Sequence, residues 1–384
     1  MPSHAKNLIL ILILWVGGLL AAGQFAKIAV LLPEIRTLYP FSGSAIAWLL
    51  TLISLVGAIL GGLAGSIANR IGQKNVLIAC LLVAGLLSLW QASLPSFGIM
   101  AVSRVLEGLT HLGIVVAAPS FIAQLSSDRW RGAAMSLWST FFGVSFALFA
   151  LAAIPLAARF GVTAVFQAHG AMMIMVAVAL LIFLGDIGKP LNKNETTGNT
   201  FFAAYRQWPK LWPGIGWLFY TLTFVSMLAI LPDQIEDSLR GPTTTAMPLI
   251  SIVVSLIAVP LLLLRFSGAM VVMGGFVCCA AAILLSAVLS LPVIAVVLFG
   301  ALGLVQGATF AAVAEINTST EDRAQGCGIL AQTGNIGNLL GTPLFLAVLE
   351  WGNINMMLGA AFVTYAVGFV CLVLTAKRLQ IQTN

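Results

Sequence analysis

Four ionisable residues lie inside strongly apolar segments of the chain: Lys27, Arg104, Glu107 and His111. A charged group costs roughly 2.5 to 3.5 kcal/mol at the centre of a bilayer on insertion scales, so such residues are kept where they do chemistry or pair with one another. Glu107 and His111 follow Arg104 at i+3 and i+7, which places all three on one helical face. The basic groups favour recognition of an anion, and Glu107 and His111 are candidates for proton coupling.

The same residues have structural interpretations. Arg104 and Glu107 could form a neutral intrahelical pair that never meets a solute. His111 could be a core histidine bonded to a neighbouring carbonyl, and Lys27 could extend outward to the membrane interface. The sequence leaves these alternatives open.

The elements that must position these residues are expected to be transmembrane helices. Hydrophobic residues make up 60% of the 384-residue chain and charged residues 8%. Apolar stretches near the bilayer-spanning length of about twenty residues fill most of it. The expected spans are 8–32, 44–66, 76–94, 97–124, 133–157, 162–184, 211–231, 243–264, 268–289, 292–315, 325–349 and 355–376. The fold class is therefore an all-α membrane protein with twelve transmembrane helices.

A polar connector at residues 185–210 divides the chain into two halves of six spans, 1–184 and 211–384. A partial internal repeat supports this division, because DRWRG at 128–132 matches DRAQG at 322–326. Duplicated bundles around a central site are a common design of secondary transporters. The connector is expected to be a flexible cytoplasmic linker.

The basic residues indicate the topology. Most of those in the connectors fall on the side of the two termini, and only Arg36, Arg159 and Arg240 fall on the other side. By the positive-inside rule both termini are expected in the cytoplasm, with the chain in the inner membrane. The calculated pI near 9.3 then reports topology, and no nucleic-acid partner is expected. The five cysteines show no metal-ligand spacing, so neither a metal nor a cofactor is expected.

The connector between the second and third spans reads GSIANRIGQK at 65–74, which resembles the signature loop of the major facilitator superfamily. Two residues depart from that pattern: Asn69 stands where the family usually has Asp, and Gln73 where it usually has Arg. Arg104 followed by Gly108 is similar to the family's intramembrane motif. The resemblance implies two six-helix bundles, a central cavity lined by the first and fourth spans, and a monomer. It also implies conformational roles for Gly65, Asn69, Arg70, Gly72, Lys74, Asp128, Arg129, Asp322 and Arg323.

The second half contributes uncharged hydrogen-bonding residues, among them Tyr220, Gln306, Gln332 and Asn335. Buried amides in a membrane need partners, so interhelical bonding is an alternative to solute contact. The predicted substrate-binding set is Lys27, Arg104, His111, Tyr220, Gln306, Gln332 and Asn335.

These features predict a secondary active transporter that moves a small organic, anionic solute by alternating access and couples it to protons. Its expected partners are the small-molecule substrate, protons and the lipid bilayer. The fifth span lacks the Gly-Pro pair of proton-driven drug antiporters, and Gln24 and Lys27 stand where many of them keep an acid. Efflux of drugs or amphipathic metabolites is the alternative. Neither a nucleotide-binding loop nor a hydrolytic motif is present in the sequence, so the chain is not expected to be an enzyme. Two short runs resemble cyanate-transporter-like members of the superfamily.

Overall fold

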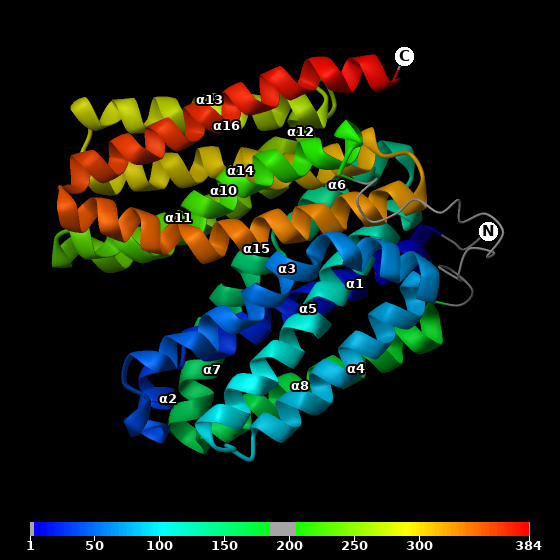
Figure 1. The fold of residues 1–384 in the computed structure, drawn as a ribbon, viewed down its shortest axis with the longest axis vertical. Coiled ribbons are helices and arrows are strands. Elements are labelled where there is room, and N and C mark those ends of the chain that lie inside the picture. Colours follow the sequence, from blue (N-terminus) through cyan, green and yellow to red (C-terminus); the bar gives the residue numbers. More distant parts are fainter. Residues whose placement is uncertain (1–3, 185–204, 384) are drawn as a thin grey trace.

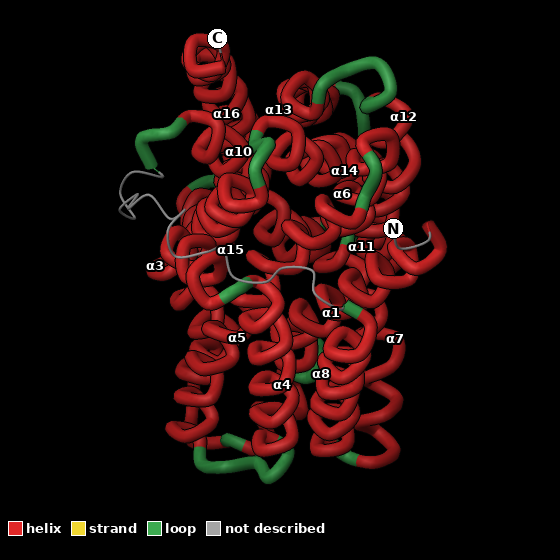
Figure 2. Tube along the Cα trace, turned by 90° about the vertical axis from the view of Figure 1, so that its right-hand side faces the viewer, coloured by secondary structure: helices red, strands yellow, loops and turns green. Residues whose placement is uncertain are grey.

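The computed structural model describes residues 4–184 and 205–383, and over these ranges it consists of helices and short connections with no strand (Figure 2). The helices of the first half are α1 (His4–Ala29), α2 (Leu32–Leu38), α3 (Trp48–Ile71), α4 (Gln73–Gln91), α5 (Phe97–Leu125), α6 (Asp128–Ser139), α7 (Phe141–Phe160) and α8 (Val162–Phe183). Those of the second half are α10 (Trp208–Ile230), α11 (Asp237–Val253), α12 (Val259–Leu262), α13 (Gly268–Leu284), α14 (Leu291–Ile316), α15 (Thr320–Trp351) and α16 (Ile354–Thr383).

Eleven helical segments among the described residues are long and apolar enough to cross a membrane. Two of them are composite: α6 and α7 together form the fifth expected span, and α11 and α12 form the eighth around a π-helical turn at Val254–Ala258. The expected span at 325–349 is α15, a 32-residue helix that falls outside the eleven. Its amide side chains, Gln332, Asn335 and Asn338, make it more polar than the other long helices.

The two halves form two groups of helices that meet at one end of the molecule and diverge toward the other (Figure 1). The N-terminus, the C-terminus and both ends of the undescribed connector lie at the end where the groups meet. There α3 packs against α15, and α6 packs against α14. One apolar core, built mostly from α1, α4, α5 and α8, continues across this contact to Phe310, Cys327 and Leu330 of the second half.

The contact between α3 and α15 depends on glycines spaced four residues apart: Gly57, Gly61 and Gly65. A Cβ added at Gly61 would lie 2.6 Å from the Cα of Gln332, and one at Gly65 would lie 2.7 Å from the Cα of Gln325. Small residues at such positions let two transmembrane backbones approach closely. The glycines therefore allow the two halves to close on each other at this end.

Much of the 65–74 connector is helical. The helix that contains the expected second span, α3, continues to Ile71 and carries Asn69 and Arg70 on its last turn. A single residue, Gly72, joins α3 to α4 with a φ of 96°. Only glycine adopts that backbone conformation without strain, so the chain reverses there within one residue.

Candidate substrate and coupling site

A central cavity lies between the two halves and encloses about 750 Å³ of empty space, part of it open to solvent. Its walls come from α1, α5, α6 and α7 on one side and from α10, α14 and α15 on the other. Of the predicted substrate-binding residues, those that line it are His111, Tyr220, Gln306 and Asn335.

Gln306 joins the two halves at the wall of this cavity. Its Oε1 accepts hydrogen bonds from the Tyr220 hydroxyl and the Ser251 hydroxyl, each at 3.0 Å. Its Nε2 donates to the backbone carbonyl of Ser139 at 2.7 Å, across the interface. The amide is thus held in one orientation by its partners.

Two asparagines of α15 line the cavity with less complete bonding. The Asn335 amide nitrogen donates to the Ala331 carbonyl at 2.7 Å. The Oδ1 atom of Asn338 is buried and has no hydrogen-bond partner among the described residues. Because a buried acceptor without a partner is costly, this atom is suited to receive a donor from a bound solute.

Aromatic rings cover much of the remaining wall. Trp217 stacks on Tyr220 with ring centroids 4.6 Å apart, and Phe310 meets Trp217 edge-on at 5.1 Å. On the opposite side, Phe25 contacts Phe142 at 5.6 Å. Such rings give a rigid surface for the apolar face of an organic molecule.

His111 is the one predicted ionisable residue that reaches this cavity. Its Nδ1 lies 3.0 Å from the carbonyl oxygen of Ala21, and its ring meets Phe25 edge-on at 5.1 Å. A carbonyl oxygen can only accept, so Nδ1 carries the proton of the neutral ring. Nε2 is then the atom that can gain and lose a proton.

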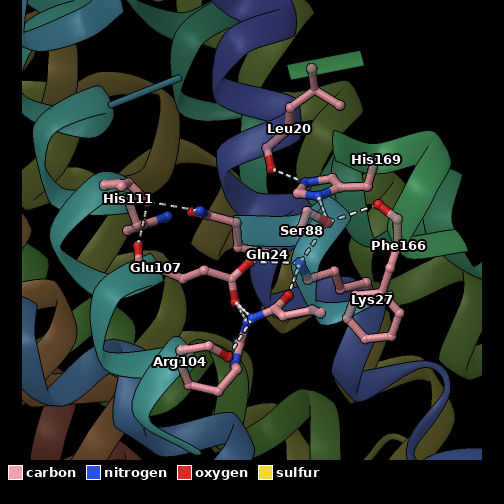
Figure 3. A network of polar contacts seen from close by, with 12 residues as sticks. Leu20, Gln24, Lys27, Ser88, Arg104, Glu107, His111, Phe166 and His169 are labelled. Carbon is pink, nitrogen blue, oxygen red and sulfur yellow. Dashed lines mark hydrogen bonds and ion pairs between the residues drawn. The ribbon is translucent and has the colours of Figure 1, made fainter. Parts of the chain in front are cut away.

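Lys27, Arg104 and Glu107 form a buried ion triad within the first half (Figure 3). The Lys27 Nζ lies 2.6 Å from Oε1 of Glu107, and Nη1 of Arg104 pairs with Oε2 of the same carboxylate. All three residues are 0% exposed. Arg104 also donates from Nε to the Leu49 carbonyl at 2.8 Å, while its buried Nη2 has no partner among the described residues. With both bases and the acid ionised, the triad carries one excess positive charge.

Side chains from α4 and α8 surround the triad. The Gln91 Oε1 accepts from Lys27 at 2.7 Å and its Nε2 donates to Glu107 at 2.8 Å. The Ser88 hydroxyl lies 3.0 Å from both the Lys27 Nζ and the Nδ1 of His169, and the His169 Nε2 lies 2.8 Å from the Leu20 carbonyl. Sequence reasoning missed Gln91 and Ser88, although a glutamine inside an apolar span was a detectable signal.

The placement of the triad differs from the expected net positive pocket. Lys27 does not extend to the membrane interface, because Glu107 and Gln91 hold it inside the bundle. The triad residues do not line the central cavity in this conformation. Gln332 is also outside the cavity lining. Its Nε2 donates to the Ala58 carbonyl at 2.9 Å in the contact between α3 and α15.

The predicted conformational residues lie at the end where the halves meet. Asn69 donates to the Glu321 carbonyl of the second half at 3.3 Å and accepts from Gln73 at 2.8 Å. An amide in place of the family's acid can therefore still bond across the interface. Arg70 is exposed in the last turn of α3, two residues before Gly72, and Lys74 lies in the first turn of α4.

The two repeated Asp-Arg pairs have different surroundings. Asp128 is exposed and pairs with Arg131 at 2.7 Å, and Arg129 lies over the Trp130 ring. In the second half, Asp322 pairs with Lys210 at 2.8 Å and Arg323 donates to the Asn317 carbonyl at 2.8 Å. Partial burial opposes ionisation of Asp322, but its bonds with Lys210 and Ser319 outweigh this and hold the pKa of the carboxyl below its usual range.

Comparisons with known proteins agree with this architecture. A family model of the Major Facilitator Superfamily matches residues 14–320. The putative metabolite transport protein YwtG of Bacillus subtilis (strain 168) is 36% identical over 84 residues, which are 22% of this chain and 18% of that protein. The galactose-proton symporter of Escherichia coli (strain K12) is 29% identical over 124 residues, which are 32% of this chain and 26% of the symporter. The chain thus matches less than a third of the length of either relative.

Solved transporters share the fold over nearly the whole chain. FucP in the outward conformation superposes with a TM-score of 0.77 at 16% identity, covering 96% of this chain and 99% of FucP. The human organic anion transporter MFSD10 gives a TM-score of 0.72 at 16% identity, covering 97% of this chain and 100% of that chain. At such identities the similarity concerns the fold alone.

Proposed function

Because the chain belongs to the Major Facilitator Superfamily and is a multi-pass membrane transporter, we propose that it carries a small organic anion through the central cavity by alternating access. The two halves pack against each other at the end that holds the termini (Figure 1). The basic connectors predict that the termini lie in the cytoplasm, so we infer that this conformation faces outward across the inner membrane. The chain acts as a monomer in this proposal, without nucleic acid.

The orphan acceptor on Asn338 carries the proposal for how the solute binds. A hydroxyl or N–H group of the solute would donate to this oxygen, while the rings of Trp217 and Tyr220 contact its apolar face. A site built to bond a polar group discriminates strongly against an analogue that lacks it. The solute class is therefore an organic molecule with at least one hydrogen-bond donor.

The excess positive charge of the triad supports the anionic character of the solute. Glu107 and Arg104 are on α5, one and two helical turns from His111 at the cavity wall. The Coulomb attraction between charges one or two helical turns apart is far stronger in a medium of low dielectric than in water. The triad would thus favour an anion in the cavity without touching it.

Proton coupling is assigned to His111 first and to Glu107 second. The His111 imidazole borders the cavity, where its Nε2 can exchange a proton with water or solute. Glu107 is held by two cations and Gln91, so it can be protonated only in a conformation that separates these groups. The sugar-proton symporters to which the chain is similar are consistent with this coupling.

The experiment is a binding and uptake series with matched solutes and an isosteric variant. Purified protein would be screened by thermal shift against hydroxylated anions, the same anions without hydroxyls, and uncharged analogues. Hydroxylated anions should stabilise wild type most, and Asn338→Leu should bind both kinds of anion equally and about ten-fold more weakly than wild type binds the hydroxylated one. Uptake into proteoliposomes should follow the same order.

The aromatic lining of the cavity would also suit an amphipathic drug, so efflux of such a drug is the alternative function. It applies if the charge of the triad does not affect solute binding. Stabilisation by lipophilic cations, and by none of the anions, would contradict the proposal and support efflux. Equal stabilisation of wild type and Asn338→Leu by every solute would remove Asn338 from the site.

A further inference from the structure

A second cavity opens on the flank of the first half, between α1, α7 and α8, and encloses about 760 Å³ of empty space, part of it open to the surroundings. It shares no lining residue with the central cavity. Three of its lining residues, Val16, Leu148 and Met172, are also exposed on the outer surface, at 37%, 49% and 39%. The cavity is therefore a groove that faces the membrane, away from the transport pathway.

The groove offers a bound molecule almost nothing but hydrocarbon. Its two polar lining residues, Ser145 and His169, are already bonded within the protein. The Ser145 hydroxyl donates to the Leu19 carbonyl at 2.7 Å, and both ring nitrogens of His169 have partners. A cavity without free polar groups does not hold water, and in a membrane the available filling is an acyl chain.

An arginine stands at the outer end of the same helical stripe. Ser145, Ala152 and Arg159 follow one another on α7 at intervals of seven residues, which keeps them on one face. Ser145 and Ala152 line the groove, and Arg159 lies beyond its end in the last turn of α7. Among the described residues Arg159 has no ion pair, and its guanidinium lies over the Phe160 ring at 5.2 Å. An unpaired guanidinium at the membrane surface is suited to a phosphate.

The dimensions of one lipid leaflet match this arrangement. Half of a hydrocarbon core is about 15 Å deep, which corresponds to about ten residues of helix. Ten residues before Arg159 on α7 is Phe149, which lines the groove with its ring centroid 5.8 Å from that of His169. A lipid whose phosphate is at Arg159 thus has one chain along the groove that reaches these two rings.

We propose that this groove is a specific phospholipid site, in which Arg159 binds the headgroup phosphate and one acyl chain lies between α1, α7 and α8. The bound chain packs on His169, which contacts Ser88 and through it the ion triad. The lipid would therefore support the side of the bundle that holds the triad. This proposal does not depend on the transported solute.

Native mass spectrometry of the delipidated protein titrated with phosphatidylglycerol tests the site. Wild type should bind one lipid more tightly than the rest. Arg159→Gln should weaken that first lipid about five-fold, because it removes the phosphate contact. Ala152→Phe should weaken it at least as much, because the ring fills the groove.

Two controls should leave the first lipid unchanged: Leu151→Phe, which places the same ring at a neighbouring position 76% exposed on α7, and Arg36→Gln, which removes an exposed arginine on the same side of the membrane. The melting temperature of each lipid-free variant checks its fold. If neither groove variant weakens binding, the lipid is a general surface lipid and the proposal is wrong. Equal binding of diacylglycerol, which lacks the phosphate, would overturn the role of Arg159.

Discussion

Glu107 is the one carboxylate that pairs with both buried cations, Lys27 and Arg104. Loss of the Glu107 charge should therefore destabilise the bundle more than loss of the Lys27 charge. Glu107→Gln leaves Lys27 and Arg104 facing each other without a counter-charge. Removing one partner of a buried ion pair typically costs about 3 to 5 kcal/mol. Lys27→Met instead leaves a neutral pair of Arg104 and Glu107, with an apolar side chain of similar length.

The expected order of stability is therefore wild type, then Lys27→Met, then Glu107→Gln with much the lowest melting temperature. Unfolding of the purified variants in one detergent measures it. A Glu107→Gln protein as stable as Lys27→Met would show that Lys27 is already uncharged in the folded state. Anion binding should weaken in Lys27→Met, because that change also removes the excess positive charge.

The two buried histidines separate coupling from structure. His111→Gln should uncouple solute movement from the proton gradient while solute exchange across the membrane persists, because Nε2 at the cavity is lost. His169→Gln is the control: it changes a ring bonded to Ser88 and Leu20, so it should lower stability and leave the pH dependence of transport unchanged. Gradient-driven uptake and counterflow in proteoliposomes distinguish the two. If a proton gradient still accelerates solute uptake by His111→Gln, we would assign proton coupling to Glu107 instead.

At the scale of the element, the sequence predicted the positions of the helices well and their contacts poorly. Each expected span corresponds to a helix or to a composite of two, because apolar length alone determines whether a segment can cross a bilayer. The spacing of Arg104, Glu107 and His111 correctly placed them along one helix. It could not show that Lys27 would bond to Glu107 and Gln91, since these contacts join α1, α4 and α5 and depend on how the helices are rotated. Gln332 could not be assigned to the closed end for the same reason.

The glycines of α3 give a prediction for this element. Gly61→Ala places a methyl group against the backbone of Gln332, which a side-chain movement cannot relieve. The contact between α3 and α15 should loosen, so fewer molecules should be closed at the end that holds the termini. Transport should drop several-fold. The distance between spin labels at positions 74 and 323, in a background with the native cysteines replaced, measures this opening.

Gly98→Ala is the matched control, because nothing lies within 4 Å of a Cβ added there. It should leave both the label distance and transport unchanged. An unaltered distance distribution in Gly61→Ala would mean that the α3 glycines do not limit closure.

At the scale of the whole molecule, one apolar core passes from the first half to Phe310, Cys327 and Leu330 of the second half. Closure of the halves at the end that holds the termini therefore buries apolar surface. Opening that end wets part of this core, and wetting apolar surface raises the heat capacity. The free-energy difference between the two conformations should therefore vary non-linearly with temperature. Because hydrophobic association weakens on cooling, cold should favour the state that is open toward the termini. This carrier would then change its resting orientation with the temperature of its surroundings, with no change in solute or proton gradient.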